Sequence, residues 1–522
     1  MNKKFPAKIM LLALLTLQLF FAIFWGIKKE GYYIDEPWSY GLANSHYQPF
    51  LHETDNYMHQ WHEPDFYYNY VLVNEGETFD YNSVIYNQSQ DVHPPIYYLF
   101  LHTICSFFVG TYSKWFGLGL NLFFYLGTSF VLYNITKEYV KKDSIMLYIP
   151  SFLYSVCAGG ISTYLYIRMY MMLTFWGVLF LFLVLRMMDK NSNTIKAWFY
   201  LFLFLCTIAG TLTQYYFLIY AFFLSIVYCL WRLVRKEFKA FLLYGLSVCG
   251  GIGVSCSLFP FMLNHIFLGN KGQEVFSNAS QGFHNWIRKM WSYTHVIGTE
   301  LFGNLQILLL CFGITCLAFL FLLYFFARHK KLIPVKLLSI YILVVGYFSV
   351  ISLVSNEVVD RYQFMIFPLI ILSFWITLYY VLETINKEQL LWIALLLYLV
   401  PVLMQYKSGQ INYLYTGYED VRTYISTNLK EIPGIYITNG NHLVINNIFF
   451  LGEQTNTYPI RIENIENLPI LLKESNADKL ILYVDINFDE YETAKMVAKM
   501  MSYNEVRLLY DNTFTQIFIL EQ

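Results

Sequence analysis

Long apolar runs separated by short charged loops are the feature that most limits what this chain can fold into. A helix needs about 20 apolar residues to cross a bilayer, and eleven runs approach or exceed this length. They cover residues 8–27, 115–134, 145–160, 169–185, 197–213, 215–231, 241–263, 301–326, 335–355, 363–382 and 390–405. The pattern predicts an α-helical polytopic membrane protein with about eleven transmembrane helices.

Composition supports the same class. The chain has 522 residues, of which 57% are hydrophobic and 14% charged, too few polar side chains to cover a soluble globule of this size. The formal net charge is −1, and no basic domain predicts a nucleic-acid partner. The eight cysteines all lie in apolar stretches without metal-site spacing, so we interpret them as packing residues.

The first apolar run follows Lys3, Lys4 and Lys8, which is also how a signal peptide begins. It is longer than a signal-peptide core and has no small-residue cleavage site before Lys28. We therefore expect a helix that stays in the membrane.

Lysines and arginines mark alternate loops, which the positive-inside rule assigns, together with the N-terminus, to the cytoplasm. The segment 94–109 begins with two prolines and would reverse every later loop if it crossed the bilayer, so we expect a juxtamembrane helix there. Lys28 and Lys29 oppose this orientation, because they flank the first run on the predicted outer side. The residues used are Lys137, Lys141, Lys142, Arg186, Lys190, Lys196, Arg232, Arg235, Lys236, Lys239, Arg328, Lys330, Lys331 and Lys336.

The division predicted from the sequence is a transmembrane domain over residues 1–405 and an external C-terminal α/β domain over 406–522. The transmembrane domain contains two long external loops, 28–113 and 264–300, and loops of this length are usually functional. In the tail, the pattern predicts helices over 415–425 and 489–501 and strands over 434–439, 458–462, 479–485 and 507–511.

Asp35 and Glu36 lie a few residues beyond the end of the first run. A carboxylate held at the water edge of a membrane can take a proton from a hydroxyl group. Adjacent helical residues point about 100° apart, so one acid is expected to catalyse and the other to support it. The alternative is that these acids only favour the start of a helix that has Pro37 in its first turn.

Asp91 and His93 precede the pair Pro94-Pro95, which fixes the backbone and starts the next helix. We expect these side chains to be rigidly presented and to bind an acceptor, a phosphate or a metal ion. The alternative is a simple acid cap at a helix N-terminus.

Arg168 and Arg361 lie at predicted external turns beside apolar runs, where a guanidinium group is costly unless it is paired. A phosphate suits such a group because its planar fork can hold two oxygens. Asp360 or Glu357 could instead pair with Arg361, and each arginine could simply extend towards the interface. Gln214 and Tyr215, at another external turn, could add hydrogen bonds, although tyrosines there more often form an interfacial belt.

The order of these features resembles the GT-C glycosyltransferases of the protein O-mannosyltransferase and aminoarabinose transferase type. The features are the acidic pair, DVHPP at residues 91–95, RMY at 168–170, TQYY at 213–216 and RY at 361–362. The resemblance covers about residues 1–405. It implies an enzyme that takes a hexosyl or pentosyl group from a polyprenyl-phosphate (dolichyl or undecaprenyl) carrier and transfers it, with inversion, to an acceptor on the outer face.

Carried over by position, the resemblance makes Asp35 the catalytic base, with Glu36 beside it. It assigns substrate-binding roles to Asp91, His93, Arg168, Tyr170, Gln214, Tyr215, Arg361 and Tyr362. Many relatives have an acid just before RMY, where this chain has Tyr164–Ile167. We therefore expect transfer without a metal ion or other cofactor, with a bound divalent ion as the alternative.

The expected partners are the lipid-linked sugar donor, membrane lipid, and an acceptor in the cell envelope, which could be a glycan, lipid or protein. Two other classes stay open. A transporter or flippase for lipid-linked sugars would also use arginines and aromatic grooves, but it predicts paired repeats and broken helices. A receptor or scaffold would need its helices only as an anchor.

Overall fold

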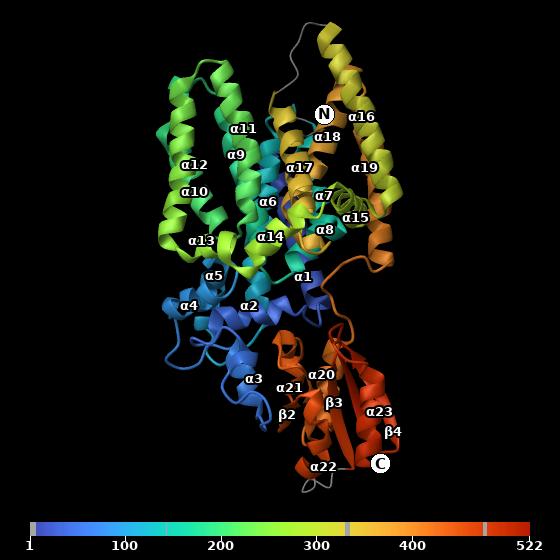
Figure 1. Cartoon of the computed structure of the whole chain (residues 1–522). Helices are drawn as coiled ribbons and strands as arrows, with labels where there is room; N and C mark the ends of the chain where they lie inside the picture. Colours follow the sequence, from blue (N-terminus) through green and yellow to red (C-terminus); the bar gives the residue numbers. More distant parts are fainter. Residues whose placement is uncertain (1–6, 142–143, 329–334, 473–477) are drawn as a thin grey trace. The chain divides into compact units, whose positions relative to one another are not determined.

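The computed structural model describes residues 7–141, 144–328, 335–472 and 478–522 (Figure 1). Contacts divide the chain into two compact units. Unit 1 contains the residues up to Ile27, then 92–97 and 118–412, and unit 2 contains 28–91, 98–117 and 413–522. Most of the predicted first external loop therefore belongs to the same unit as the C-terminal residues.

Nine helices in the described part of the chain are long and apolar enough, by length and composition, to cross a membrane. This architecture is consistent with the predicted polytopic helical fold, and most of these helices lie in unit 1. They are α1 (Ala7–Lys28), α6 (Lys114–Thr136), α9 (Tyr170–Met188), α11 (Tyr216–Val234), α12 (Phe238–Leu258), α16 (Leu305–Arg328), α17 (Val335–Val354), α18 (Phe367–Thr384) and α19 (Leu390–Lys407).

The burial of these helices differs in a way that suits an apolar surrounding. The spans containing α9 and α18 are each 72% buried, whereas only 11% of the α16 span is buried. Leu310 and Leu317 on α16 are 64% and 70% exposed. A continuous exposed apolar surface is unfavourable in water and is typical of a surface that meets lipid or protein.

Two of the eleven predicted spans are not among these nine helices. Residues 145–160 form a short turn (η2, Ile145–Leu147) and two eight-residue helices, α7 (Ile149–Val156) and α8 (Ala158–Leu165), with extended backbone at Cys157 between them. The break brings Gly160 so close that an added Cβ would lie 1.8 Å from the carbonyl oxygen of Tyr154. Residues 197–213 form α10 (Ala197–Thr211), which has 15 residues.

The two predicted external loops are largely helical. Helix α5 (Ile96–Ser106) has 11 residues, which is short for a span and agrees with the predicted juxtamembrane length. The segment 264–300 forms η4 (Asn264–Leu268), α14 (Asn270–Ser280) and α15 (Phe283–Phe302), after the short α13 (Phe261–Leu263). Helix α15 buries one face, including Tyr293, and ends at Gly303, whose φ of 82° favours glycine.

Several charged residues of the predicted cytoplasmic loops form ion pairs with one another within unit 1. Glu138 after α6 lies 2.8 Å from Arg186 of α9 and 3.8 Å from Lys336 of α17. Lys141 lies 3.0 Å from Glu383 at the end of α18. These helix ends therefore share one side, as the alternation of basic loops predicts, whereas Lys3, Lys4, Lys142, Lys330 and Lys331 lie outside the described residues.

Unit 2 combines short helices from the first loop with a mixed sheet from the tail. The sheet has the strand order β2-β1-β3-β5-β4, in which β1, β2 and β3 are parallel and β5 is antiparallel to both β3 and β4. The strands are β1 (Gly434–Ile437), β2 (Thr457–Ile460), β3 (Lys479–Asp485), β4 (Glu505–Asp511) and β5 (Thr515–Glu521). The helices and short turns are α2 (Asp35–Asn44), η1 (Leu51–Glu53), α3 (Pro64–Val71), α4 (Tyr81–Gln90), most of α5, α20 (Tyr418–Asn428), η7 (His442–Asn447), α21 (Ile448–Leu451), η8 (Ile462–Asn467), α22 (Leu468–Leu471) and α23 (Glu490–Met501).

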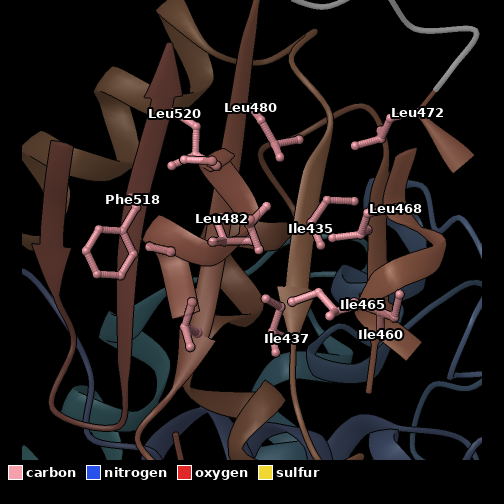
Figure 2. Packing of buried hydrophobic residues seen from close by; sticks show 14 of the residues in the cluster. Ile435, Ile437, Ile460, Ile465, Leu468, Leu472, Leu480, Leu482, Phe518 and Leu520 are labelled. Atoms are coloured by element: carbon pink, nitrogen blue, oxygen red, sulfur yellow. The ribbon is translucent and has the colours of Figure 1, made fainter. Parts of the chain in front are cut away.

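The sheet has a continuous apolar core on one face (Figure 2). Alternate residues of a strand point to the same face, and this alternation brings Ile435 and Ile437 of β1 beside Leu482 and Val484 of β3. Helix α23 covers the core with Val497. The helices predicted over 415–425 and 489–501 and the four predicted strands are confirmed in outline, while β5 adds a strand that the sequence pattern did not predict.

Asp485 ends β3 with no solvent exposure and makes the stability of unit 2 depend on pH. Its carboxylate accepts hydrogen bonds from Tyr436 and Thr515, and burial raises the pKa of Asp485 from 3.8 to about 6. The folded protein therefore binds this proton more tightly than the unfolded chain. We expect stability to fall as pH rises from about 4 to about 6, and Asp485→Asn to remove that slope. Thermal unfolding across this range measures it, and equal slopes in both proteins would contradict it.

Candidate active site

Glu36 is fixed inside unit 2 by an ion pair at the start of α2. Its side chain is fully buried, with Oε2 2.7 Å from the backbone nitrogen of Tyr33 and 3.0 Å from Nζ of Lys29. Asp35, one residue earlier, is half-buried, and its carbonyl oxygen accepts a hydrogen bond from Ser39. The structure thus gives the two adjacent acids different surroundings: Glu36 is immobilised beside a cation, and Asp35 keeps access to solvent.

Lys29 connects this pair to the C-terminal residues of unit 2. Its side chain is fully buried and donates a second hydrogen bond, 2.7 Å long, to the carbonyl oxygen of Tyr413. Burial lowers the pKa of Lys29, while the negative charge of Glu36 acts against that change. Lys29 is therefore a buried structural residue of unit 2.

Further contacts within unit 2 join the first loop to the tail. His62 and Thr457 exchange backbone hydrogen bonds of 2.8 and 3.0 Å next to strand β2. Arg422 of α20 lies 2.6 Å from Glu453 and donates a 3.1 Å hydrogen bond to the hydroxyl group of Tyr68. The tail therefore supports the loop that carries Asp35.

Asp91 and His93 separate into different units. Asp91 follows α4, and its backbone nitrogen donates to Asn87. His93 belongs to unit 1, where Nη2 of Arg168 lies 3.4 Å from its Nδ1 and 3.5 Å from its Nε2. The structure thus brings together His93 and Arg168, two of the predicted substrate-binding residues.

Arg168 lies in a rigid turn between α8 and α9. It is only 5% exposed, and its backbone nitrogen donates a 2.7 Å hydrogen bond to the carbonyl oxygen of Tyr166. The amide of Asn121 donates to the carbonyl oxygens of Tyr164 and Tyr166, at 2.9 and 2.8 Å. These bonds hold the turn, so the guanidinium group starts from a fixed backbone.

Arg361 lies on the short turn η5 (Asp360–Tyr362), after α17. Its guanidinium carbon is 5.9 Å from the ring centre of Tyr166 and 5.4 Å from that of Tyr362, a range in which cation–π attraction operates. Tyr166 also stacks on Tyr170, with ring centres 5.8 Å apart. Arg361 and the Arg168 turn therefore meet at Tyr166. We call His93, Tyr166, Arg168, Tyr170, Arg361 and Tyr362 the arginine cluster.

Gln214 and Tyr215 form the turn before α11. The side chain of Gln214 accepts a 2.6 Å hydrogen bond from the backbone nitrogen of Tyr215, and the hydroxyl group of Tyr215 lies 2.9 Å from Nδ1 of His265. The next residue, Tyr216, contacts Tyr362 with ring centres 5.5 Å apart. These contacts give the tyrosines specific partners inside unit 1.

Sequence reasoning did not assign roles to His265, Glu300 or Asn412. His265 sits on the π-helical turn η4, a local distortion that apolar periodicity does not reveal. Glu300 and Asn412 are 112 positions apart but joined by a 2.6 Å hydrogen bond. The sequence alone offers one signal for this contact, which is the presence of the acid Glu300 in an amphipathic helical segment.

Unit 2 also has a groove of about 730 Å³, lined by residues at the amino ends of the parallel strands and by the side chain of Trp61. None of the predicted site residues lines it. Among the described residues, no group of three or more His, Cys, Asp or Glu side chains is arranged to hold a metal ion.

The predicted site residues therefore fall into two sets. Asp35, Glu36 and Asp91 belong to unit 2, and the arginine cluster with Gln214 and Tyr215 belongs to unit 1. No family model matches this chain, and the search of curated proteins finds no match.

Proposed function

We propose that this protein is a membrane glycosyltransferase that moves a sugar from a polyprenyl-phosphate carrier to an acceptor hydroxyl group on the outer face of the membrane. The observation that carries the proposal is the arginine cluster, in which two arginines and a histidine are gathered among tyrosines beside apolar helices. A phosphate ester with a long apolar tail has the chemistry to match both parts of this region.

The reaction would be a single displacement with inversion at the anomeric carbon. Asp35 accepts the proton of the acceptor hydroxyl group, and the acceptor oxygen forms a bond to the anomeric carbon. The bond from that carbon to the phosphate oxygen breaks, and polyprenyl phosphate leaves with the electron pair. Arg168 and Arg361 stabilise the charge that develops on the phosphate.

The different surroundings of the two acids support these roles. Glu36 is held by Lys29 and by the backbone of Tyr33, which leaves it little freedom to exchange protons with a substrate. Asp35 is half-buried at the start of the same helix. The base is therefore Asp35, with Glu36 as the residue that fixes the start of α2.

Analysis of cell-envelope material tests the function in its natural setting. Mass spectrometry would compare glycans, lipids and proteins from cells with and without the gene. We expect one glycosyl increment to be missing without the gene and restored by the wild-type gene but not by the Asp35→Asn form. An unchanged envelope in all glycoconjugate classes would contradict the proposal.

The role of Arg168 predicts a specific kinetic effect. Arg168→Lys keeps the charge but loses the planar fork, so we expect kcat/KM for the donor to fall by about 100-fold. Arg186→Lys is the matched control, because Arg186 lies in the last turn of α9, the helix that follows the Arg168 turn, with its side chain 40% exposed and paired with Glu138. Steady-state kinetics of sugar transfer at varied donor concentration test this prediction. An equal loss of kcat/KM in both variants would contradict a phosphate-binding role for Arg168.

A flippase or transporter for lipid-linked sugars is the second candidate. The break at Cys157 between α7 and α8 favours it, since discontinuous helices are common at transport sites. Measurements in detergent solution distinguish the two functions, because there is no membrane with two sides across which a lipid could be moved. An enzyme still releases polyprenyl phosphate there, and a flippase leaves the donor intact.

A further inference from the structure

Glu300, near the end of α15, is a buried acid outside the roles described so far. It is 3% exposed, and its Oε1 accepts a 2.6 Å hydrogen bond from Nδ2 of Asn412. Its Oε2 is buried and has no hydrogen-bond partner among the described residues. A buried carboxylate oxygen without a donor is costly when it is charged.

Asn412 connects Glu300 to the turn that carries Arg361. The same Nδ2 donates a 2.9 Å hydrogen bond to Oδ2 of Asp360, and Oδ1 of Asp360 accepts a 2.7 Å hydrogen bond from the backbone nitrogen of Arg361. The backbone nitrogen of Asn412 donates to the hydroxyl group of Ser162 on α8, at 3.1 Å. The side chain and backbone of Asn412 together therefore join α15, the turn η5 and α8 within unit 1.

Two carboxyl groups that share one amide donor cannot both be charged cheaply. Burial and the charge of Asp360 both raise the pKa of Glu300 well above its usual value, while a hydrogen bond with the hydroxyl group of Ser162 acts against this rise. The titratable and charged groups on the elements around Glu300 are Asp360 and Arg361 on η5, Cys157 at the start of α8 and Tyr398 on α19, whose hydroxyl group donates to the carbonyl oxygen of Leu301.

The neighbouring amide of Gln405 fixes the backbone of Glu300. Its Nε2 donates to the carbonyl oxygens of Thr299 and Glu300, at 2.6 and 3.0 Å, and its Oε1 accepts from the backbone nitrogen of Ala158. The end of α15 is thereby tied to the start of α8, which fixes the backbone from which the carboxyl group of Glu300 extends.

We propose that Glu300 is held as a neutral acid and acts, through Asn412 and Asp360, as a positioning residue that fixes the backbone of Arg361. Its effect on sugar transfer rests on the function proposed above, whereas its charge state and its hold on the Arg361 turn do not. Each part therefore has its own measurement.

The charge state is tested by stability in purified full-length protein. Because the pKa of Glu300 is raised by folding, its contribution to stability is complete at pH values below the pKa of the unfolded chain. This contribution is lost as the pH rises from that pKa towards the pKa in the folded protein. Wild type should therefore lose stability relative to Glu300→Gln as pH rises above 4.5, the ordinary pKa of a glutamate. If the stabilities of the two proteins change with pH in parallel, Glu300 is not held as a neutral acid. The same conclusion follows if Mg²⁺ or Ca²⁺ stabilises EDTA-treated wild type but does not stabilise Glu300→Gln.

Hydrogen exchange tests the hold on the Arg361 turn without any assay of transfer. Asn412 is exposed, so Asn412→Ala should remove the connection without emptying the core. We expect at least 10-fold faster amide exchange in a peptide covering residues 357–366 and no change in α9. Asn428→Ala, at an exposed amide in α20, is the control, and unchanged exchange at 357–366 would overturn the positioning role.

Transfer kinetics then connect the two results. Glu300→Gln should keep kcat/KM for the donor within about threefold at neutral pH, and Asn412→Ala should lower it about 10-fold with KM for the acceptor unchanged. Loss of activity in Glu300→Gln would show that the ionised form is needed and overturn the inference. If wild type does not transfer sugar, the proposed function is wrong. The pH dependence of stability and the hydrogen exchange at residues 357–366 would still test the charge state and positioning role of Glu300.

Discussion

Replacing Asp35 with Asn is expected to lower the rate of glycosyl transfer by about 10²–10⁴-fold, the usual contribution of a positioned base. The amide has nearly the same size as the carboxylate but cannot accept a proton from the acceptor. Asp35 is half-buried, and its carbonyl oxygen, which this change leaves in place, is the acceptor for Ser39. The protein should therefore stay folded, and the loss should appear mainly in kcat.

Asp65→Asn is the matched control for this experiment. Asp65 also occupies the first turn of a helix in the first loop, α3, next to a proline, and it is exposed. Its replacement should leave transfer within about twofold of wild type. A fully active Asp35→Asn protein, or an equal loss in both variants, would show that Asp35 is not the base.

Replacing Lys29 with Met is expected to destabilise the protein by about 3–5 kcal/mol, because it leaves Glu36 buried without its cation. The ion pair is 3.0 Å long with both side chains fully buried. The change also removes the hydrogen bond to the carbonyl oxygen of Tyr413. The fall in thermal unfolding temperature, with circular dichroism as the readout, measures the effect.

The double variant Lys29→Met, Glu36→Gln separates loss of the pair from loss of packing. A neutral glutamine can still accept the hydrogen bond from the backbone of Tyr33, so the double variant should recover much of the stability lost in the single variant. Lys499→Met in the last turn of α23 is the control for removing a lysine charge. If Lys29→Met is as stable as this control, the buried pair does not hold the start of α2.

Apolar run length predicted most of the helices well because it reports directly on the cost of placing polar groups in an apolar surrounding. It failed at 145–160, where the run is continuous but the chain breaks at Cys157. Hydropathy does not distinguish a buried helix from two buried helices at an angle. The close approach at Gly160 that accompanies the break is a tertiary contact.

The sheet shows a similar limit. Strand β3 was predicted with its observed bounds because KLILYVD is a long β-branched and apolar run. Strand β5 has only the short apolar segment Ile517–Leu520, and its strand character depends on pairing with both β3 and β4. Pairing between distant segments is not visible in local periodicity.

The candidate site could be predicted only residue by residue. Arg168 and Arg361 stand out in the sequence because charge is rare among apolar runs, and the structure brings both to Tyr166. The connection from Glu300 through Asn412 to Asp360 joins three segments that are far apart in the chain. No spacing rule links such residues, so the contact needed the fold.

The central claim is tested most directly by incubating the purified protein in detergent with polyprenyl-phosphate sugars and envelope acceptors. Mass spectrometry follows the release of polyprenyl phosphate, and NMR gives the anomeric configuration of the product. We predict release that requires Asp35 and a product with inverted configuration. Absence of release from every hexosyl and pentosyl donor, or a product with retained configuration, would contradict the proposed single displacement.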